Sequence, residues 1–333
     1  MAETANPDTA NVIEPDDFGP DETDSAFGSD AGSDMTSLAS SIQRYRHENG
    51  RRYHAYKDGN YNFPNDDQEM DRLDLQHHLF SLTTNGKLHL APIKKDVQRV
   101  LDIGTGTGIW AIDFADEYPS AEVIGTDLSP TQPTFVPPNL RFIIDDAEET
   151  WVFGKKFDYI HGRMLVGSFT NWSRFFEQCY ENLEPGGWLE LQDLTAPLKC
   201  DDGTVKEDLA ISKWDRLLRD AGENIGRRVD TPRSYTKWMT EAGFTNVQLV
   251  PYKWPQNPWP KADREKEIGL WNQQNMEDGL QGLSMGLLTR ALGWSQREVE
   301  MLLVEVRKDF RNKYIHGYWD VFMVYGQKPE THT

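Results

Sequence analysis

A glycine-rich turn flanked by two acidic residues carries the strongest chemical signal in this chain of 333 residues. Asp102 precedes the run GTGTG at residues 104–108, and Asp127 follows Gly104 by 23 positions. Such a turn lets the backbone approach a ligand, and an acidic side chain at the tip of the next strand accepts hydrogen bonds from both ribose hydroxyls of a nucleoside. The arrangement therefore predicts a nucleoside-binding site.

The spacing of the glycines discriminates between nucleoside cofactors. The dinucleotide fingerprint G-x-G-x-x-G is not matched, because the third glycine comes one position early and Ile109 stands where a small residue is needed. A Walker A loop is excluded, since no Gly-Lys-Ser/Thr follows. An Asp two residues before G-x-G-x-G suits a cofactor without phosphate whose amino-acid end lies over the glycines, which favours S-adenosylmethionine. The alternative is a purely structural turn.

A further strand end extends the predicted site. The strand predicted over residues 140–144 leads into Asp145, Asp146 and Ala147. An Asp-Ala pair in this place can offer a carboxylate to the adenine amino group and a backbone amide to a ring nitrogen. Asp145 and Asp146 compete for this role, and the sequence leaves the choice open.

The elements that position these residues alternate between strands and helices. Apolar runs predict five strands, near residues 100–103, 121–127, 140–144, 157–160 and 188–191. Helical periodicity between them predicts an α/β fold with a doubly wound, Rossmann-like parallel sheet, whose ligand-binding loops lie at the carboxyl ends of the strands. Residues 245–255 and 318–326 are similar to a sixth and a seventh strand of such a sheet.

These motifs together resemble a known family. LDIGTGTGIWAIDFA, GTDLSP, DDAEE, FDYIHGRML and LEPGGWLELQD resemble the successive motifs of class I S-adenosylmethionine-dependent methyltransferases. ENGRRYHAYKDGNYNFPNDDQEMDRLDLQHH, WPQNPWPK and HGYWDVFMVYGQKP narrow the resemblance to the fungal LaeA-like methyltransferases, over roughly residues 42–328. The resemblance implies a seven-stranded sheet and S-adenosylmethionine as the cofactor.

The resemblance also implies the cofactor contacts. Asp127, which has no evident structural role, would hold the ribose, whereas Gly108 can serve helix packing alone. The full set of implied contacts is Asp102, Gly104, Gly106 and Gly108 at the methionine end, Asp127 at the ribose, Leu128 on the adenine ring, and Asp146 with Ala147 at the adenine edge.

Two polar residues follow the fourth predicted strand, near the expected position of the transferred methyl group. Methyl transfer requires alignment, exclusion of water and sometimes removal of one proton. His161 is the predicted base because its ordinary pKa is about 6.5; the alternative is that it orients the loop or bonds a backbone carbonyl. Arg163 is expected to act beside it, anchoring a substrate carboxylate or pairing with Glu190.

The stretch YRHENGRRYHAYKDGNYNFPND, residues 45–66, precedes a predicted helix over residues 69–82 and contains almost no aliphatic side chain. We expect it to cover the cofactor site as an N-terminal cap, because tyrosine rings can cover an adenosyl group and arginine can pair with a carboxylate. The alternative is a solvated loop. The predicted contacts are Tyr53 with the cofactor, and Tyr45, Arg51, Tyr61 and His77 with substrate or cofactor.

A helical insertion, about residues 256–315, separates the last two predicted strands. Residues 267–293 and 295–312 have helical periodicity, and we expect them to form one wall of the substrate pocket. Trp271 is the predicted substrate contact in this wall. Met276, Met285 and Trp294 are further apolar candidates, and core packing is the alternative for all four.

The charge of the chain is unevenly distributed. Residues 1–40 contain ten of the 54 acidic residues and no Lys or Arg, which predicts a disordered tail that is either a solubilising leader or an arm that binds a protein partner. The net charge is −19, of which the tail supplies −10, and the −9 of the remaining chain argues against nucleic-acid binding. We expect no membrane span and a cytoplasmic location. The predicted organisation is a tail over 1–40, a cap segment and helix over 41–95, and a methyltransferase domain over 96–328.

Two functions follow from these expectations. The first is methylation of an apolar or aromatic small-molecule metabolite at oxygen, nitrogen or sulfur. The second, implied by the resemblance, is a LaeA-like regulator of secondary metabolism that acts in a protein complex, which would place the chain in the nucleus. No metal site is expected.

Overall fold

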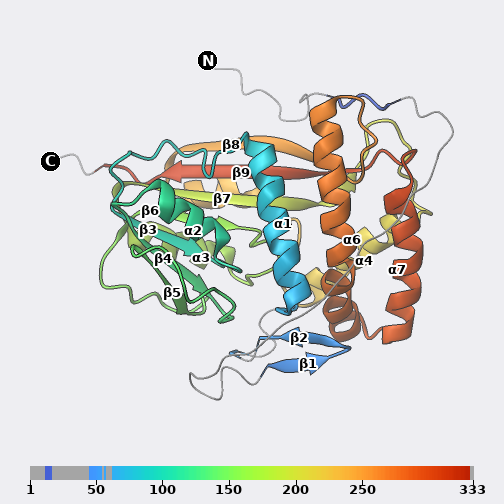
Figure 1. The fold of residues 1–333 in the computed structure, drawn as a ribbon, viewed down its shortest axis with the longest axis horizontal. Coiled ribbons are helices and arrows are strands. Elements are labelled where there is room, and N and C mark those ends of the chain that lie inside the picture. The colour runs from blue at the N-terminus through green and yellow to red at the C-terminus, as the bar shows by residue number, and fades with distance from the viewer. Residues whose placement is uncertain (1–11, 17–44, 55, 58–61, 331–333) are drawn as a thin grey trace.

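The computed structural model describes residues 12–16, 45–54, 56–57 and 62–330, and Figure 1 shows its fold. A seven-stranded sheet occupies one side of the molecule, and the helices α6 (Asp263–Leu292) and α7 (Gln296–Arg311) occupy the other. Helix α1 (Asp67–Thr84) lies between them, where it packs along α6. The sheet and the two long helices α1 and α6 together frame the site.

The sheet has the strand order β5-β4-β3-β6-β7-β9-β8. Its first five strands along the chain are parallel, whereas β9 runs antiparallel to both β7 and β8. This arrangement confirms the predicted α/β, seven-stranded sheet of the class I methyltransferase type. The strands are β3 (Arg99–Ile103), β4 (Glu122–Asp127), β5 (Leu140–Ile144), β6 (Phe157–Arg163), β7 (Leu183–Lys199), β8 (Thr245–Pro255) and β9 (Tyr318–Gln327).

Successive residues of the central strands face opposite helical layers, as the pleat of a strand requires. In β3, Leu101 and Ile103 belong to the core that contains α3 (Trp172–Asn182) and α5 (Tyr235–Glu241). Val100 belongs to the core of α2 (Ile109–Glu117) on the other face. Asp102 shares the face of Val100, and the strand register puts it beside His161 of β6.

Strand β7 is much longer than the prediction of residues 188–191. Its second half pairs antiparallel with β9, from Trp188 opposite Gln327 to Lys199 opposite Tyr318. Because the partner strand comes much later in the chain, the local apolar pattern did not reveal this extension. The long β7, β8 and β9 carry the sheet beneath α1 and α6 (Figure 1).

The predicted helical insertion before the last strand is present as α6 and α7, which lie between β8 and β9. Both helices pack on α4 (Ala210–Asn224), which is followed by the short 3-10 helix η2 (Thr231–Ser234). Ser295 caps α7 and forms a capping box with Glu298, which explains the sharp start of that helix. Among the described residues, no helix is both long and apolar enough to span a membrane.

The N-terminal cap begins with a hairpin of β1 (Arg46–Glu48) and β2 (Arg51–Tyr53). Asn49 and Gly50 form its turn, with φ angles of 52° and 77°. A two-residue hairpin turn favours Asn-Gly because both positions need left-handed backbone angles. The cap prediction missed this hairpin signal.

Helix α6 presents three glycines to the cap along one face, which we call the glycine seam: Gly279, Gly282 and Gly286. A Cβ atom on Gly286 would lie 2.6 Å from the carbonyl oxygen of Asn62, and one on Gly282 would lie 3.0 Å from Cγ of Pro64. The cap backbone therefore lies directly on the helix. A side chain larger than hydrogen has no room at these contacts.

Residues 12–16 lie in a defined place on the molecule. Pro15 forms a bridge with Pro260, and the backbone N–H of Asp16 donates to the carbonyl of Trp259 at 3.0 Å. The Asp16 carboxylate also pairs with Lys266 near the start of α6. These five residues of the predicted disordered tail are therefore docked against the insertion.

Candidate active site

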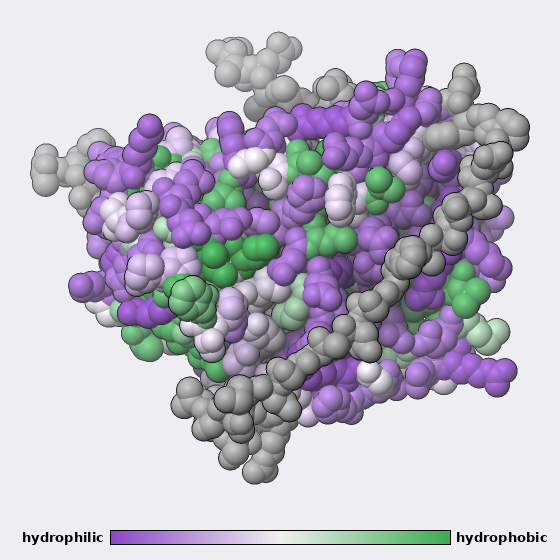
Figure 2. All heavy atoms as spheres, in the orientation of Figure 1, coloured by the Kyte–Doolittle hydropathy of each residue, from purple (hydrophilic) through white to green (hydrophobic). Residues whose placement is uncertain are grey.

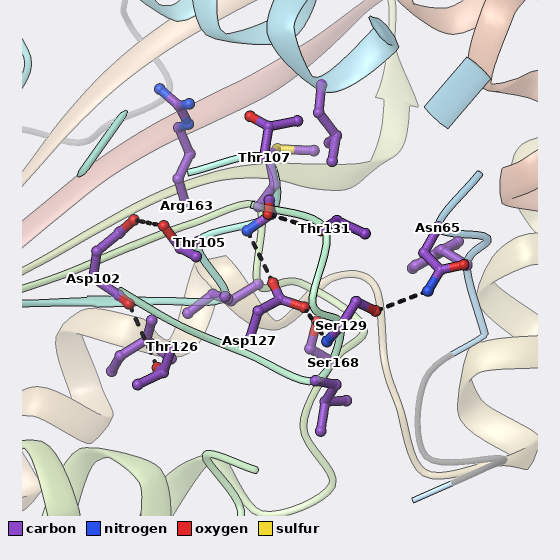
Figure 3. A pocket seen from close by; sticks show the side chains of 18 of the residues that line it. Asn65, Asp102, Thr105, Thr107, Thr126, Asp127, Ser129, Thr131, Arg163 and Ser168 are labelled. Atoms are coloured by element: carbon purple, nitrogen blue, oxygen red, sulfur yellow. Dashed lines mark hydrogen bonds between the residues drawn. The ribbon is translucent and has the colours of Figure 1, made fainter. Parts of the chain in front are cut away.

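A cavity of about 200 Å³ opens at the carboxyl ends of β3, β4, β5 and β6, and Figure 3 shows part of its wall. The loops that follow these strands form one side of it. Helix α1, the segment 63–65 before it and Leu283 of α6 form the opposite side. The cavity therefore lies between the predicted ligand loops and the cap.

The glycine-rich turn forms the floor of the cavity. Gly104 and Gly106 have φ angles of 64° and 59° and both line the cavity. A Cβ atom on Gly104 would lie 2.6 Å from Leu165, so the turn needs glycine there on two counts. Gly108 is not in the wall, and its Cα faces the ring of Phe142. This placement favours the packing role that the sequence left open for Gly108.

Asp127 ends β4 beside this turn, and its carboxylate spans two backbone donors. It accepts hydrogen bonds from the N–H of Gly106 and the N–H of Ser129, both at 2.9 Å (Figure 3). Burial raises the pKa of Asp127 to about 6, although these two bonds favour the ionised form. Leu128, the next residue, also lines the cavity.

Both acidic candidates at the end of β5 line the cavity, together with Ala147. Asp146 is the more buried, at 5% exposure, and one of its oxygens accepts the N–H of Glu148 at 3.0 Å. Asp145 accepts the N–H of Asp146 at 2.9 Å, and burial raises its pKa. The two carboxylates thus remain neighbours in one wall, with Asp146 the deeper of them.

Asp102 and His161 form a buried pair at 0–2% exposure. The Asp102 carboxylate accepts the Thr105 hydroxyl at 2.5 Å and lies 2.8 Å from Nδ1 of His161. Since a carboxylate only accepts, Nδ1 carries the proton and Nε2 carries a lone pair. The imidazole stacks on Trp110 at 3.6 Å, and burial lowers its pKa. Nε2 has no hydrogen-bond partner among the described residues.

Arg163 lines the cavity and reaches α1 (Figure 3). Its Nη2 donates to Nδ1 of His77 at 2.9 Å, and Nε2 of His77 lies 2.9 Å from the Asp113 carboxylate. The alternative pairing with Glu190 is wrong, because the Glu190 carboxylate instead accepts backbone N–H groups of residues 90 and 91. His77 itself is not in the cavity wall.

The other predicted cap and insertion contacts lie away from the cavity wall. The ring of Tyr53 is buried under Arg290, and Arg51 pairs with Asp66, the N-cap of α1. Tyr45 lies under the guanidinium of Arg52. Tyr61 is outside the described residues. These side chains hold the cap in place instead of contacting the cavity.

The apolar candidates of the insertion also pack elsewhere. Trp271 makes an edge contact with His78, and Met276 and Met285 belong to the core shared by α4, α6 and α7. Trp294 packs against the same core. The expected wall of insertion residues is therefore reduced to Leu283.

The sequence analysis missed the residues that do form the cap side of the cavity. They share one origin, the segment before α1 and the inward face of α1 itself: Phe63, Pro64, Asn65, Glu69, Met70, Arg72, Leu73 and Gln76. Helical periodicity puts Met70 and Leu73 on one face of α1, but polar residues cover much of the buried side as well, so this pattern does not point to Glu69, Arg72 and Gln76. On this side of the molecule Figure 2 shows hydrophilic and hydrophobic atoms mixed. The Asn-Phe-Pro-Asn turn before the helix was the available signal.

A buried polar network ties these cap residues to α6. Arg72 pairs with Glu69 through two hydrogen bonds of 2.6 and 3.0 Å, and its Nη1 donates to Asn275 of α6 at 2.7 Å. All three residues are less than 8% exposed. We call them the Glu69–Arg72–Asn275 network. It fixes α1 against α6 at the mouth of the cavity.

Two contacts join the cap to the loops that would hold a nucleoside. The Asn65 amide donates to the Ser129 hydroxyl at 3.1 Å, and Lys57 pairs with Glu149. Ser129 is also the residue whose N–H binds Asp127. The cap therefore contacts the loops that follow β4 and β5. Within the described ranges, no group of three or more His, Cys, Asp or Glu residues could hold a metal ion.

Comparison with known proteins agrees with this geometry. The family model described as "Methyltransferase domain" matches residues 75–249. Methyltransferase pytC of Aspergillus terreus is 43% identical over 90% of this chain and 93% of its own length. Probable methyltransferase tdiE of Emericella nidulans is 41% identical over 88% and 92%, and Secondary metabolism regulator LAE1 of Cochliobolus heterostrophus is 37% identical over 85% and 94%. The chain therefore belongs to the methyltransferase domain family, among the LaeA-like proteins.

Proposed function

We propose that this protein transfers the methyl group of S-adenosylmethionine to an oxygen, nitrogen or sulfur atom of a small secondary metabolite. The observation that carries the proposal is the cavity between the glycine turn and the cap, whose floor would hold the cofactor and whose cap side would face the acceptor. The similarity to pytC and tdiE, both named as methyltransferases, supports it.

The residues of the cavity fit this cofactor. Gly104 and Gly106 place backbone in the cavity wall without side chains of their own, and the amino-acid end of the cofactor needs such a close approach. Asp127 would bind the ribose hydroxyls, and Leu128, Asp146 and Ala147 would bind the adenine. The bound cofactor supplies an activated methyl group. The chain must then align the acceptor, exclude water and take up any proton that is released.

His161 is the base that this chain offers. Asp102 fixes its tautomer through Nδ1, which leaves Nε2 with a lone pair and no hydrogen-bond partner among the described residues. Nε2 is buried, so the acceptor must reach it from the cavity that His161 lines. Burial lowers the pKa of His161, so the imidazole is neutral at neutral pH and able to act. Arg163, at the end of the same strand, contributes a positive charge at the wall rather than a second base.

The cap side of the cavity indicates the character of the acceptor. Phe63, Leu73 and Leu283 offer apolar surface, whereas Glu69 and Gln76 offer hydrogen-bonding groups. An acceptor with an apolar body and a polar edge matches this mixture better than a purely hydrocarbon one. The wall thus narrows the earlier expectation of an apolar or aromatic substrate.

The direct test is to incubate the purified protein with S-adenosylmethionine labelled in its methyl group and with a fungal metabolite extract. We expect label in a small, organic-soluble product. Binding of the cofactor without transfer of label, together with an Asp127→Ala strain that keeps its normal metabolite profile, would remove the enzyme proposal.

Replacement of the proposed base should separate catalysis from binding. His161→Asn retains an amide donor toward Asp102 but lacks Nε2, so we expect kcat to fall by about 100-fold, the usual contribution of a general base. The affinity for S-adenosylhomocysteine should change less than about threefold, because charge and burial at the glycine turn are retained. The pH profile of kcat should also lose its acid limb. An unchanged kcat, or an equal loss of affinity, assigns His161 to positioning Asp102.

A second function is favoured by the similarity to the LAE1 regulator. In that case the protein would act in a complex that controls secondary metabolism, in the nucleus, and residues 1–40 would be its docking arm. Deletion of residues 1–11 and 17–40 in the cell, with the docked residues 12–16 retained, tests this function. Loss of metabolite production with normal methyl transfer in vitro would favour the regulator.

A further inference from the structure

Arg163 is a partly buried cation without an anionic partner among the described residues. Among the described residues, its single hydrogen-bond acceptor is Nδ1 of His77, and its guanidinium also lies over the ring of Phe80 at 4.8 Å. Asp74, Asp102 and Asp113 act on it only at longer range. Burial lowers the pKa of Arg163 to about 10, so it is still charged at neutral pH. A partly buried guanidinium that faces a cavity and has no counter-ion is suited to bind an anionic ligand there.

The surroundings locate that ligand. Ile103 of β3 pairs with Gly162 of β6, so Arg163 lies next to the glycine turn that begins at Gly104. The guanidinium has five N–H donors in a planar fork, and His77 accepts from one of them. The remaining donors match a carboxylate, the planar anion that arginine binds with two parallel hydrogen bonds.

His77 determines how Arg163 is presented. A guanidinium can only donate, so Nδ1 of His77 must be the acceptor and its proton must be on Nε2. Nε2–H in turn donates to Asp113 of α2 at 2.9 Å. Three elements, α1, α2 and β6, thus form a chain of directed hydrogen bonds that ends at the cavity wall.

We propose that Arg163 is a carboxylate anchor beside the glycine turn and that His77, held by Asp113, is its positioning residue. The inference rests on the proposed cofactor, whose amino-acid end carries a carboxylate in the region of Gly104. The carboxylate of an acidic acceptor is the other source with the same chemistry. The anchor aligns the sulfonium by holding the far end of the molecule that carries it.

Calorimetric titration with two probes tests the anchor. S-adenosylhomocysteine carries the carboxylate, whereas 5′-methylthioadenosine lacks the whole amino-acid end. We expect Arg163→Met to lower the affinity for S-adenosylhomocysteine by about 30-fold, which is in the range of charge-assisted hydrogen bonds. The affinity for methylthioadenosine should change by less than about twofold. Retained methylthioadenosine binding also shows that the variant is folded.

The positioning role is tested on the same two probes. His77→Leu should lower the affinity for S-adenosylhomocysteine by about fivefold. His77→Gln restores an acceptor for Arg163, so its affinity should be close to that of the native protein. His78→Leu is the matched control, because His78 is the next residue on the same helix and is exposed. Among the described aromatic rings, it contacts that of Trp271 in the insertion. Equal losses in the two His77 variants would overturn the positioning role.

The remaining outcomes are distinct. If Arg163→Met leaves S-adenosylhomocysteine unchanged but abolishes benzoate binding to the S-adenosylhomocysteine complex, the anchored carboxylate belongs to the acceptor. If Arg163→Met lowers the affinities for both nucleoside probes equally, Arg163 does not bind a carboxylate. The same conclusion follows if the variant changes the affinity for neither nucleoside nor for benzoate. Failure of the native protein to bind S-adenosylhomocysteine would instead contradict the proposed function, before any variant is compared.

Discussion

Asp127→Asn is expected to abolish useful cofactor binding while leaving the protein folded. The proposed contact is one carboxylate that accepts two ribose hydroxyls, and each charge-assisted bond contributes about 1.5–3 kcal/mol. Loss of both weakens S-adenosylhomocysteine by about 1000-fold, measured by calorimetry at pH 7.5. Asp116→Asn, an exposed change of the same charge on α2, is the control and should have no effect.

The raised pKa of Asp127 adds a pH dependence to this prediction. The free protein has a pKa of about 6 at this carboxyl, above the ordinary value of 3.8, so the proton is bound more tightly in the folded state. Affinity should fall as pH is lowered through about 6, because the protonated group is a poor double acceptor. The raised pKa also affects the stability of the ligand-free protein. The protonated carboxyl adds to the free energy of unfolding at low pH, and this contribution is lost as the pH rises through about 6.

The stability of the Asp127→Asn variant is therefore the critical control. The substituted amide removes the charge but keeps one oxygen to accept only one of the two backbone N–H groups. We therefore expect the unfolding midpoint of the ligand-free variant to fall by no more than about 3 °C. Native protein should also lose S-adenosylhomocysteine affinity at pH 5.5 relative to pH 7.5. Affinity that is constant over this range would show that the Asp127 carboxylate does not bind the ribose.

Gly286→Ala is expected to displace the cap from α6 and, as a consequence, to lower the affinity for the cofactor. In an open helical position this change would stabilise the helix by about 1 kcal/mol. Here the new Cβ would lie 2.6 Å from the carbonyl oxygen of Asn62, so overpacking costs about 1–3 kcal/mol instead. Because Asn65, three residues on, bonds Ser129 beside Asp127, displacement should reduce S-adenosylhomocysteine affinity by about tenfold.

Gly269→Ala is the matched control for this cap effect. Its Cβ would lie 2.3 Å from the carbonyl oxygen of Asn257, a backbone clash in the same helix but away from the cap. Both variants should unfold at lower temperature in calorimetric scans, and only Gly286→Ala should lose affinity at a temperature where both are folded. Equal affinities would mean that the glycine seam serves stability alone.

Most of the fold was predictable because its signals are local. The strand ending at Ile103 leads into GTGTG, and the parallel strands follow one another through β6 as predicted. The predicted alternation with helices is wrong between β4, β5 and β6, which loops connect. The second half of β7 and the packing of α4 against α6 were not predictable, since they depend on pairing with segments far along the chain. The hairpin at Asn49 and Gly50 was a local signal that went unused.

The candidate site divides in the same way. Asp102, Asp127, Asp146 and His161 stand at strand ends, which a parallel sheet brings together, and all four line the cavity. The contact residues on the cap were predicted from side-chain type alone. The type of a side chain does not show whether it faces the cavity or packs against α6. Tyr53 turned toward α6, while Glu69, Arg72 and Gln76 came to the cavity because a polar network, not an apolar stripe, holds α1.

The Glu69–Arg72–Asn275 network also limits how the parts of such a protein can be exchanged. Two of its members come from the N-terminal cap and the third from the insertion about 200 positions later, joined by the 2.7 Å bond from Arg72 to Asn275. In a hybrid without an acceptor at position 275, Arg72 keeps its pair with Glu69 but loses one buried hydrogen bond, at a cost of about 1–3 kcal/mol. Hybrids that exchange substrate specificity should therefore exchange the cap with α1 and the insertion together. In a recombinant library, the crossover points should lie outside both segments.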